Sequence, residues 1–134
     1  MRTAPVVIAL LLAVWLGSGP PAVAAGPEYG QAQGVVVRVC DGDTLVVDIP
    51  EYPDVIGKSI RVRLLGVDAP ELRDPDPLIR QAAQAAHRAM AALLPPGTAV
   101  TLTRIRRDKY FRLDAAVSVD GRDAAAVLGL APGP

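Results

Sequence analysis

Short runs of β-branched and alternating residues divide most of the chain into candidate strands. The strands are expected at residues 35–39, 44–49, 60–64, 100–104 and 113–119. Asp41-Gly42-Asp43 has the composition of a tight turn, so the first two strands are expected to form a β-hairpin that projects two carboxylates. In the third strand apolar and basic residues alternate, which places Arg61 and Arg63 on one face.

Between the third and fourth strands the pattern changes to that of a helix. Asp76 is placed as the N-cap with Pro77 at the first helical position, and Pro95-Pro96-Gly97 ends the helix. Its apolar stripe is expected at Leu78, Ala82, Ala85, Ala89 and Leu93. Because this stripe is mostly alanine, the helix must approach the sheet closely. His87 is placed on its polar side as a surface residue, and a last short helix is expected at residues 123–128, ending at Gly129.

Three strands, a helix and two further strands predict a mainly β, α+β domain, a five-stranded antiparallel barrel of the OB type. An SH3-like barrel has nearly the same strand count but lacks a helix in that position. The domain is expected at residues 35–131, after a flexible leader at 26–34 and before a tail at 132–134.

The first 25 residues have the order of a secretory signal peptide: Arg2, an apolar run at residues 6–16, and small residues before a cleavage site near Ala24 or Ala25. The apolar run is shorter than the roughly 20 residues of a membrane-spanning helix. We therefore expect an exported protein, periplasmic or secreted, whose mature form is a monomer without a membrane anchor.

Charge and cysteine content limit what the mature chain can be. Without Arg2 it has 13 Lys and Arg against 14 Asp and Glu, so it lacks the general positive excess of proteins that coat nucleic acid. A local basic cluster remains at Arg104, Arg106, Arg107, Lys109 and Arg112, which is either a polyanion contact or a solvated surface. Cys40 is the only cysteine, which excludes an intramolecular disulfide and favours a small buried residue.

Four short segments together carry the residues for phosphodiester chemistry. Asp43, Asp68 and a main-chain carbonyl near Ala69 are the oxygen ligands that a hard cation such as Ca²⁺ takes. The guanidinium groups of Arg63 and Arg112 match the oxygens of a phosphodiester and its more highly charged transition state. A nearby carboxylate, Glu71, is suited to position or deprotonate the attacking water. Each segment alone also fits an ordinary turn or surface.

The order and spacing of these segments resemble the staphylococcal nuclease (thermonuclease) family over roughly residues 36–131. The matching motifs are residues 39–44 (Val-Cys-Asp-Gly-Asp-Thr), 63–71 (Arg-Leu-Leu-Gly-Val-Asp-Ala-Pro-Glu) and 108–113 (Asp-Lys-Tyr-Phe-Arg-Leu). The resemblance implies an OB-fold endonuclease that hydrolyses DNA and RNA with Ca²⁺ and releases 3′-phosphorylated products.

The same resemblance assigns roles to individual positions. It implies that Asp43, Asp68 and the Ala69 main-chain carbonyl bind the metal, and that Arg63, Glu71 and Arg112 are catalytic. It further implies that Lys109 and Tyr110 contact a terminal phosphate, with Asp41 and Thr44 in supporting positions.

Two departures from the family pattern bear on function. Phe111 stands where well-known members of the family have glycine. It is next to Arg112, whose orientation depends on this loop. The C-terminal helix of the family, with aromatic residues able to stack on a base, has no counterpart in this sequence. An alternative is therefore a weakly active or inactive OB-fold module that binds single-stranded nucleic acid or a protein partner.

Overall fold

The structure is a computed structural model that describes residues 27–109 and 111–130. The expected signal peptide and the tail at 132–134 lie outside these residues. The elements, in chain order, are β1 (Ala32–Asp41), β2 (Thr44–Asp48), α1 (Asp54–Gly57), β3 (Ile60–Leu64), α2 (Pro77–Leu93), β4 (Ala99–Arg107), β5 (Leu113–Val119), β6 (Arg122–Asp123) and α3 (Ala124–Leu128). Within the described ranges, no helix combines the length and the apolar character that crossing a membrane requires.

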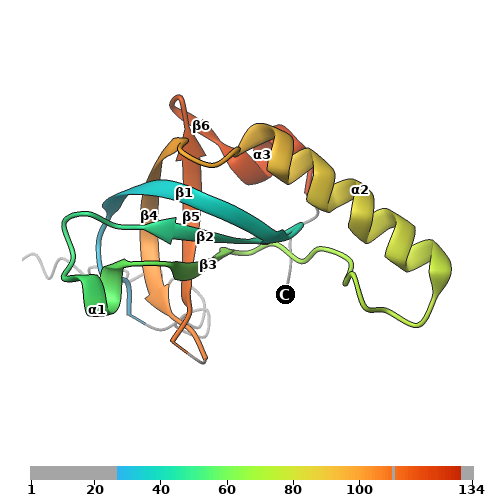
Figure 1. Ribbon diagram of the computed structural model, residues 1–134, viewed down its shortest axis with the longest axis horizontal. Helices are drawn as coiled ribbons and strands as arrows, with labels where there is room; N and C mark the ends of the chain where they lie inside the picture. Colours follow the sequence, from blue (N-terminus) through green and yellow to red (C-terminus); the bar gives the residue numbers. More distant parts are fainter. Residues whose placement is uncertain (1–26, 110, 131–134) are drawn as a thin grey trace, which may run out of the picture.

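Strands β1 to β5 form a closed barrel with the order β3-β2-β1-β4-β5, and β3 also pairs with β5 (Figure 1). All neighbouring pairs are antiparallel except the closing one, in which Val62 and Leu113 are partners in a parallel ladder. With α2 inserted between β3 and β4 and α3 near the C-terminal end, this is the expected OB-type α+β architecture. The barrel therefore contains one parallel pair of strands, whereas the sequence predicted antiparallel pairs throughout.

The barrel interior is filled by the apolar positions that alternate along the strands. Leu45, Val47, Val62, Leu102 and Val117 are fully buried, and α2 adds Met90 and Leu94 to the same core. Burial of aliphatic side chains of this size contributes about 1.5–3 kcal/mol each. This core fixes which residues of each strand point outwards, and Arg61 and Arg63 are among these, as expected from the alternation in β3.

The buried face of α2 differs from the predicted stripe. Ala83, Met90 and the C-cap Leu94 are buried, whereas Leu78 is 73% exposed. The first half of α2 extends past the barrel (Figure 1), so an apolar residue there has nothing to pack against. Because alanine occurs on every side of α2, the sequence does not distinguish the buried face of the helix from the exposed one. The predicted N-cap is confirmed, since the Asp76 side chain accepts a hydrogen bond from the Leu78 amide.

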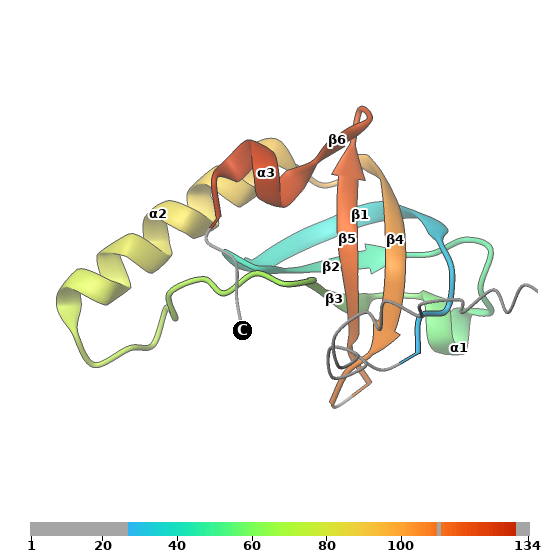
Figure 2. The same ribbon diagram turned by 180° about the vertical axis from the view of Figure 1, so that it is seen from behind.

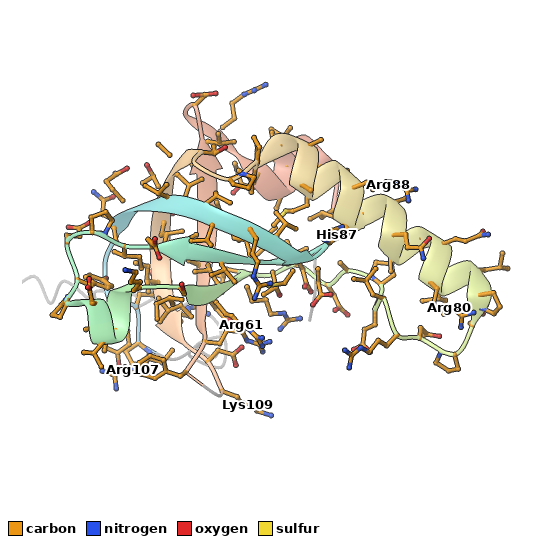
Figure 3. The ribbon with its side chains drawn as sticks, in the orientation of Figure 1. Arg61, Arg80, His87, Arg88, Arg107 and Lys109 are labelled. Carbon is orange, nitrogen blue, oxygen red and sulfur yellow. The ribbon has the colours of Figure 1, made fainter. Side chains whose placement is uncertain are left out.

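His87 is not the free surface residue that was expected. It is half-buried, and its Nε2 lies 3.4 Å from the main-chain oxygen of Val39 in β1. In Figure 3 its side chain points towards the end of β1, while Arg88 points away from the barrel. The helix therefore contacts β1 through a polar group as well as through small apolar ones.

The segment before β1 contacts β4 through main-chain and side-chain groups. β1 begins at Ala32, inside the expected leader, and the Tyr29 amide donates to the main-chain oxygen of Ile105 at 2.7 Å. Glu28 pairs with Arg104 and Arg106, at 3.2 and 3.0 Å. Figure 2 shows this segment running beside β4. Neither α1 nor β6 was expected from the sequence.

A close contact between small residues fixes the β1–β2 turn against α2. A methyl group built on Gly42 would lie 2.7 Å from the Ala86 Cβ of α2 and 3.2 Å from the Ala69 Cβ. Only glycine allows this approach, which confirms that the alanine-rich helix packs tightly. The contact brings the turn, the helix and the loop after β3 together at one end of the barrel.

We predict that Gly42→Ala destabilises the fold by about 1–3 kcal/mol, because the added methyl group overlaps its neighbours. Urea denaturation of the variant measures this loss. Gly34→Ala is the matched control, since its new methyl group would meet Val100 at an ordinary 3.4 Å.

Ala86→Gly removes the principal overlap and should reduce the cost of Gly42→Ala in the double variant, after allowing about 1 kcal/mol for glycine within the helix. Equal losses of stability for Gly42→Ala and Gly34→Ala would contradict this account.

Candidate active site

Most of the residues expected to carry chemistry line one polar pocket of about 660 Å³. It lies between the β1–β2 turn, β3, the loop that follows β3, and the end of the β4–β5 loop. Its lining residues are Cys40, Asp41, Asp43, Thr44, Arg61, Arg63, Asp68, Ala69, Pro70, Glu71, Leu72, Arg73 and Arg112. All three sequence motifs therefore reach the same pocket, although they are far apart in the chain.

Arg63 stands between the two predicted metal-binding aspartates. Its Nε lies 3.6 Å from Asp43 Oδ2, and its terminal nitrogen lies 3.5 Å from Asp68 Oδ1. The Asp43 side chain is 13% exposed and that of Asp68 is 64% exposed, so one carboxylate sits deep in the pocket and the other at its rim. The two carboxylates thus line the same pocket, and both lie near one guanidinium group.

Local hydrogen bonds hold Asp43 in place. Thr44 is buried, and its hydroxyl donates to Asp43 Oδ1 at 3.0 Å. The main-chain oxygen of Asp43 accepts from the Leu64 amide at 2.8 Å, which joins the turn to the end of β3. Threonine is therefore needed here for its hydroxyl as well as for its β-branched shape, consistent with the supporting position assigned to it.

The loop after β3 brings Asp68 and Glu71 to the pocket. The Leu65 amide donates to the main-chain oxygen of Ala115 in β5 at 2.9 Å, and Gly66 then reverses the chain with a φ of 70°. Val67 is buried, and its main-chain oxygen lies 3.4 Å from an Arg63 nitrogen. Glu71 follows on the exposed rim of the same pocket, where it has access to water.

Arg112 is oriented by Asp108 across the β4–β5 loop. Its Nε donates to Asp108 Oδ2 at 2.6 Å, and its terminal nitrogen pairs with the same oxygen. The Asp108 amide also donates to the main-chain oxygen of Arg112, and this hydrogen bond joins the two ends of the loop. Phe111 has a φ of 57°, in the left-handed region that favours glycine.

A further carboxylate, that of Asp114, belongs to β5 close to the site. It is the ladder partner of Arg63 in β3 and of Arg106 in β4. Burial raises the pKa of Asp114 above its ordinary value of 3.8, and the neighbouring Asp108 carboxylate adds to the increase. The Asp108 pKa is lowered despite a burial contribution that opposes the shift, because the Lys109 amide and Arg112 donate to its charged form. Sequence reasoning missed Asp114, for which no motif gave a signal.

The pocket offers few protein ligands for a hard divalent cation. Among the described residues no group of three or more His, Cys, Asp or Glu side chains is arranged to hold a metal. Asp43 and Asp68 nevertheless face the same pocket, and Ala69 lines it beside them. Calcium accepts such a mixture of carboxylate, carbonyl and water oxygens. Two carboxylates, one main-chain carbonyl and several waters would therefore hold it.

Other predicted residues are placed differently. Lys109 is exposed, points outwards from the β4–β5 loop (Figure 3) and does not line the polar pocket. Tyr110 lies outside the described residues. Cys40 is half-buried at the pocket edge, where it accepts a hydrogen bond from Arg38, so it is less buried than expected. Leu72 and Arg73 also line the pocket and were not singled out from the sequence.

Three of the five residues in the expected basic cluster pair with acidic residues within the protein. Glu28 pairs with Arg104 and Arg106, whereas Asp108 pairs with Arg112. Arg107 lies over the Tyr29 ring at 4.9 Å from its centre. Two carboxylates therefore offset part of the positive charge of the cluster.

The raised pKa of Asp114 gives a prediction for stability against pH. Between 3.8 and the raised pKa, the folded protein binds more protons at this group than the unfolded chain does. Its contribution to stability therefore decreases as the pH rises through that range. Asp114→Asn stays neutral, so its melting temperature should rise relative to the wild type as the pH increases from about 4 towards neutrality. Melting curves across this range measure the difference, and a constant or opposite difference would contradict it.

Comparisons with known proteins add a partial similarity. No family model matches the chain. A segment of 51 residues is 43% identical to Protein ParB of Escherichia coli. This segment covers 38% of the present chain and 25% of that protein, so the chain spans only about a quarter of the relative that it matches.

Proposed function

We propose that this protein is a calcium-dependent phosphodiesterase of the staphylococcal nuclease type, exported from the cell and hydrolysing DNA and RNA to 3′-phosphorylated products. The observation that carries the proposal is the convergence of five charged groups on one pocket: Asp43, Asp68, Arg63, Glu71 and Arg112. A module that only binds nucleic acid has no need for paired carboxylates opposite paired guanidinium groups.

The two arginines would bind the scissile phosphodiester. Arg63 belongs to β3 and Arg112 to the loop just before β5, and both line the pocket with partly exposed side chains. Guanidinium groups donate paired hydrogen bonds to phosphate oxygens and neutralise the charge that develops in a five-coordinate transition state. Because Asp108 fixes the orientation of Arg112, little reorganisation is needed when the phosphate binds.

Glu71 would act on the attacking water. Its carboxylate is on the exposed rim of the pocket, beyond Asp68 in the same loop. A carboxylate at that place accepts a proton from water or orients it towards phosphorus. When bound to Asp43, Asp68 and the Ala69 carbonyl, Ca²⁺ would lower the pKa of coordinated water and polarise the phosphate.

A second candidate function is a weakly active or inactive OB-fold module that binds single-stranded nucleic acid or a protein partner. The internal pairing of Arg104, Arg106 and Arg112 with acidic residues favours weak or absent activity, because paired guanidinium groups attract a phosphodiester less strongly. A gel shift with single-stranded DNA separates the two functions. Binding without cleavage when Ca²⁺ is added would select the module.

We predict that the protein digests single-stranded DNA and RNA with Ca²⁺ and that EDTA abolishes digestion. Glu71→Gln should lower kcat by about 10²- to 10⁴-fold because the proton acceptor is lost. Arg63→Ala should lower it by about 10²- to 10³-fold through the loss of transition-state stabilisation. Initial rates of release of acid-soluble nucleotide measure both effects.

Matched controls are available for both substitutions. Glu51→Gln and Arg88→Ala change exposed residues that do not line the pocket and should leave the rate unchanged. Digestion that persists with EDTA and in both pocket variants would refute the mechanism.

Calcium should also stabilise the folded protein, because a ligand that binds only the native state shifts the unfolding equilibrium. At a concentration one hundred times the Kd, the gain is about 2.7 kcal/mol. The melting temperature should therefore rise on titration with Ca²⁺, and Asp43→Asn should remove the increase. An equal increase in Asp43→Asn and wild type would place the cation elsewhere.

A further inference from the structure

A second pocket, of about 530 Å³, lies at the end of the barrel where α1, the segment before β1 and the β4–β5 loop meet. Its lining residues are mostly apolar or aromatic, whereas the first pocket is mostly polar. Three aromatic side chains line it: Tyr29, Tyr52 and Phe111. The third sequence motif contributes Asp108, Phe111, Arg112 and Leu113 to its lining.

The aromatic side chains are held at the pocket by backbone contacts and packing. The Tyr29 amide is bonded to the Ile105 carbonyl, and its ring packs against the Arg107 guanidinium group. Tyr52 packs partly against the hydrophobic core. Phe111 is 69% exposed, which leaves its ring available for contact.

Arg112 connects the two pockets, since it is the residue that lines both. A phosphate bound by Arg112 in the polar pocket would therefore have its neighbouring nucleoside beside the aromatic pocket. Arg107 adds a second positive group to the wall of that pocket. Aromatic rings next to guanidinium groups form the combination that binds the flat face of a base and its adjoining phosphate.

We propose that this aromatic pocket binds a nucleobase of single-stranded nucleic acid, adjacent to the phosphodiester held by Arg63 and Arg112. The proposal rests on the proposed function, because it takes the polar pocket to hold a phosphodiester. It adds a preference for unpaired strands, since a base within a duplex does not present a free face to Tyr29, Tyr52 or Phe111. Stacking tolerates any base, so the pocket discriminates little between sequences.

The test compares binding of a short single-stranded DNA with binding of the same strand carrying base-free sugars. Calorimetry of the full chain in EDTA measures affinity without cleavage. The wild type should bind the intact strand about 10-fold more tightly, which is the effect of a stacked base. Phe111→Ala and Tyr29→Ala should each reduce this ratio without weakening binding of the base-free strand.

The comparison separates base contacts from phosphate contacts. A disturbed Arg112 would weaken binding of both strands equally, because both carry the same phosphates. Val55→Ala is the control: this residue of α1 is 80% exposed and adjoins Ile56, but does not line the pocket. It should leave the ratio unchanged.

Two outcomes would overturn the proposal. One is equal or undetectable binding of the two strands by the wild type, and the other is an unchanged ratio in both aromatic variants. Cleavage is measured separately with Ca²⁺. A base-dependent ratio without cleavage would reject the proposed nuclease activity and retain the pocket, whereas cleavage with equal binding would do the reverse.

Discussion

Arg63 belongs to β3 and Arg112 immediately precedes β5, and the parallel pairing of these two strands closes the barrel. Arg63 is opposite Asp114 in that ladder, and the Leu65 amide continues the connection to Ala115. On the other side of β3, Thr44 is opposite Arg63, which places the Asp43 carboxylate beside the guanidinium group. The site therefore depends on a contact between segments about fifty residues apart, and it assembles only when the barrel is complete.

The acidic neighbours of Arg63 and Arg112 have two opposing effects on the binding of a phosphate. Arg63 faces Asp43 and Asp68, and Arg112 faces Asp108, so each guanidinium group has an acidic neighbour. These partners orient the arginines but also reduce the positive potential that a polyanion meets. A cation bound by both Asp43 and Asp68 would neutralise their negative charge, so that Arg63 could pair with a phosphate. In this arrangement metal binding and substrate binding support each other.

The strands and the charged motifs were predictable because both depend on local sequence. Alternation in residues 60–64 gave the bounds of β3, and Asp76-Pro77 gave the start of α2. The buried face of α2 was not predictable, because alanine is accommodated equally well against a core or in water. Features that depend on contacts between residues far apart in the chain were not predicted either. Asp114 becomes important only through strands that pair across the barrel, and Tyr29 only through its contact with Arg107.

Phe111 occupies a left-handed backbone conformation beside Arg112. A side chain in that region costs about 1–2 kcal/mol relative to glycine, so the folded loop carries a local strain. Glycine would remove the strain but give the unfolded loop more conformations to lose on folding. A bulky residue therefore has less conformational freedom than glycine and limits the loop to a narrower range of shapes. Such a loop is suited to holding one arginine in one direction over a wide range of temperature, and less suited to adapting to substrates of different shape.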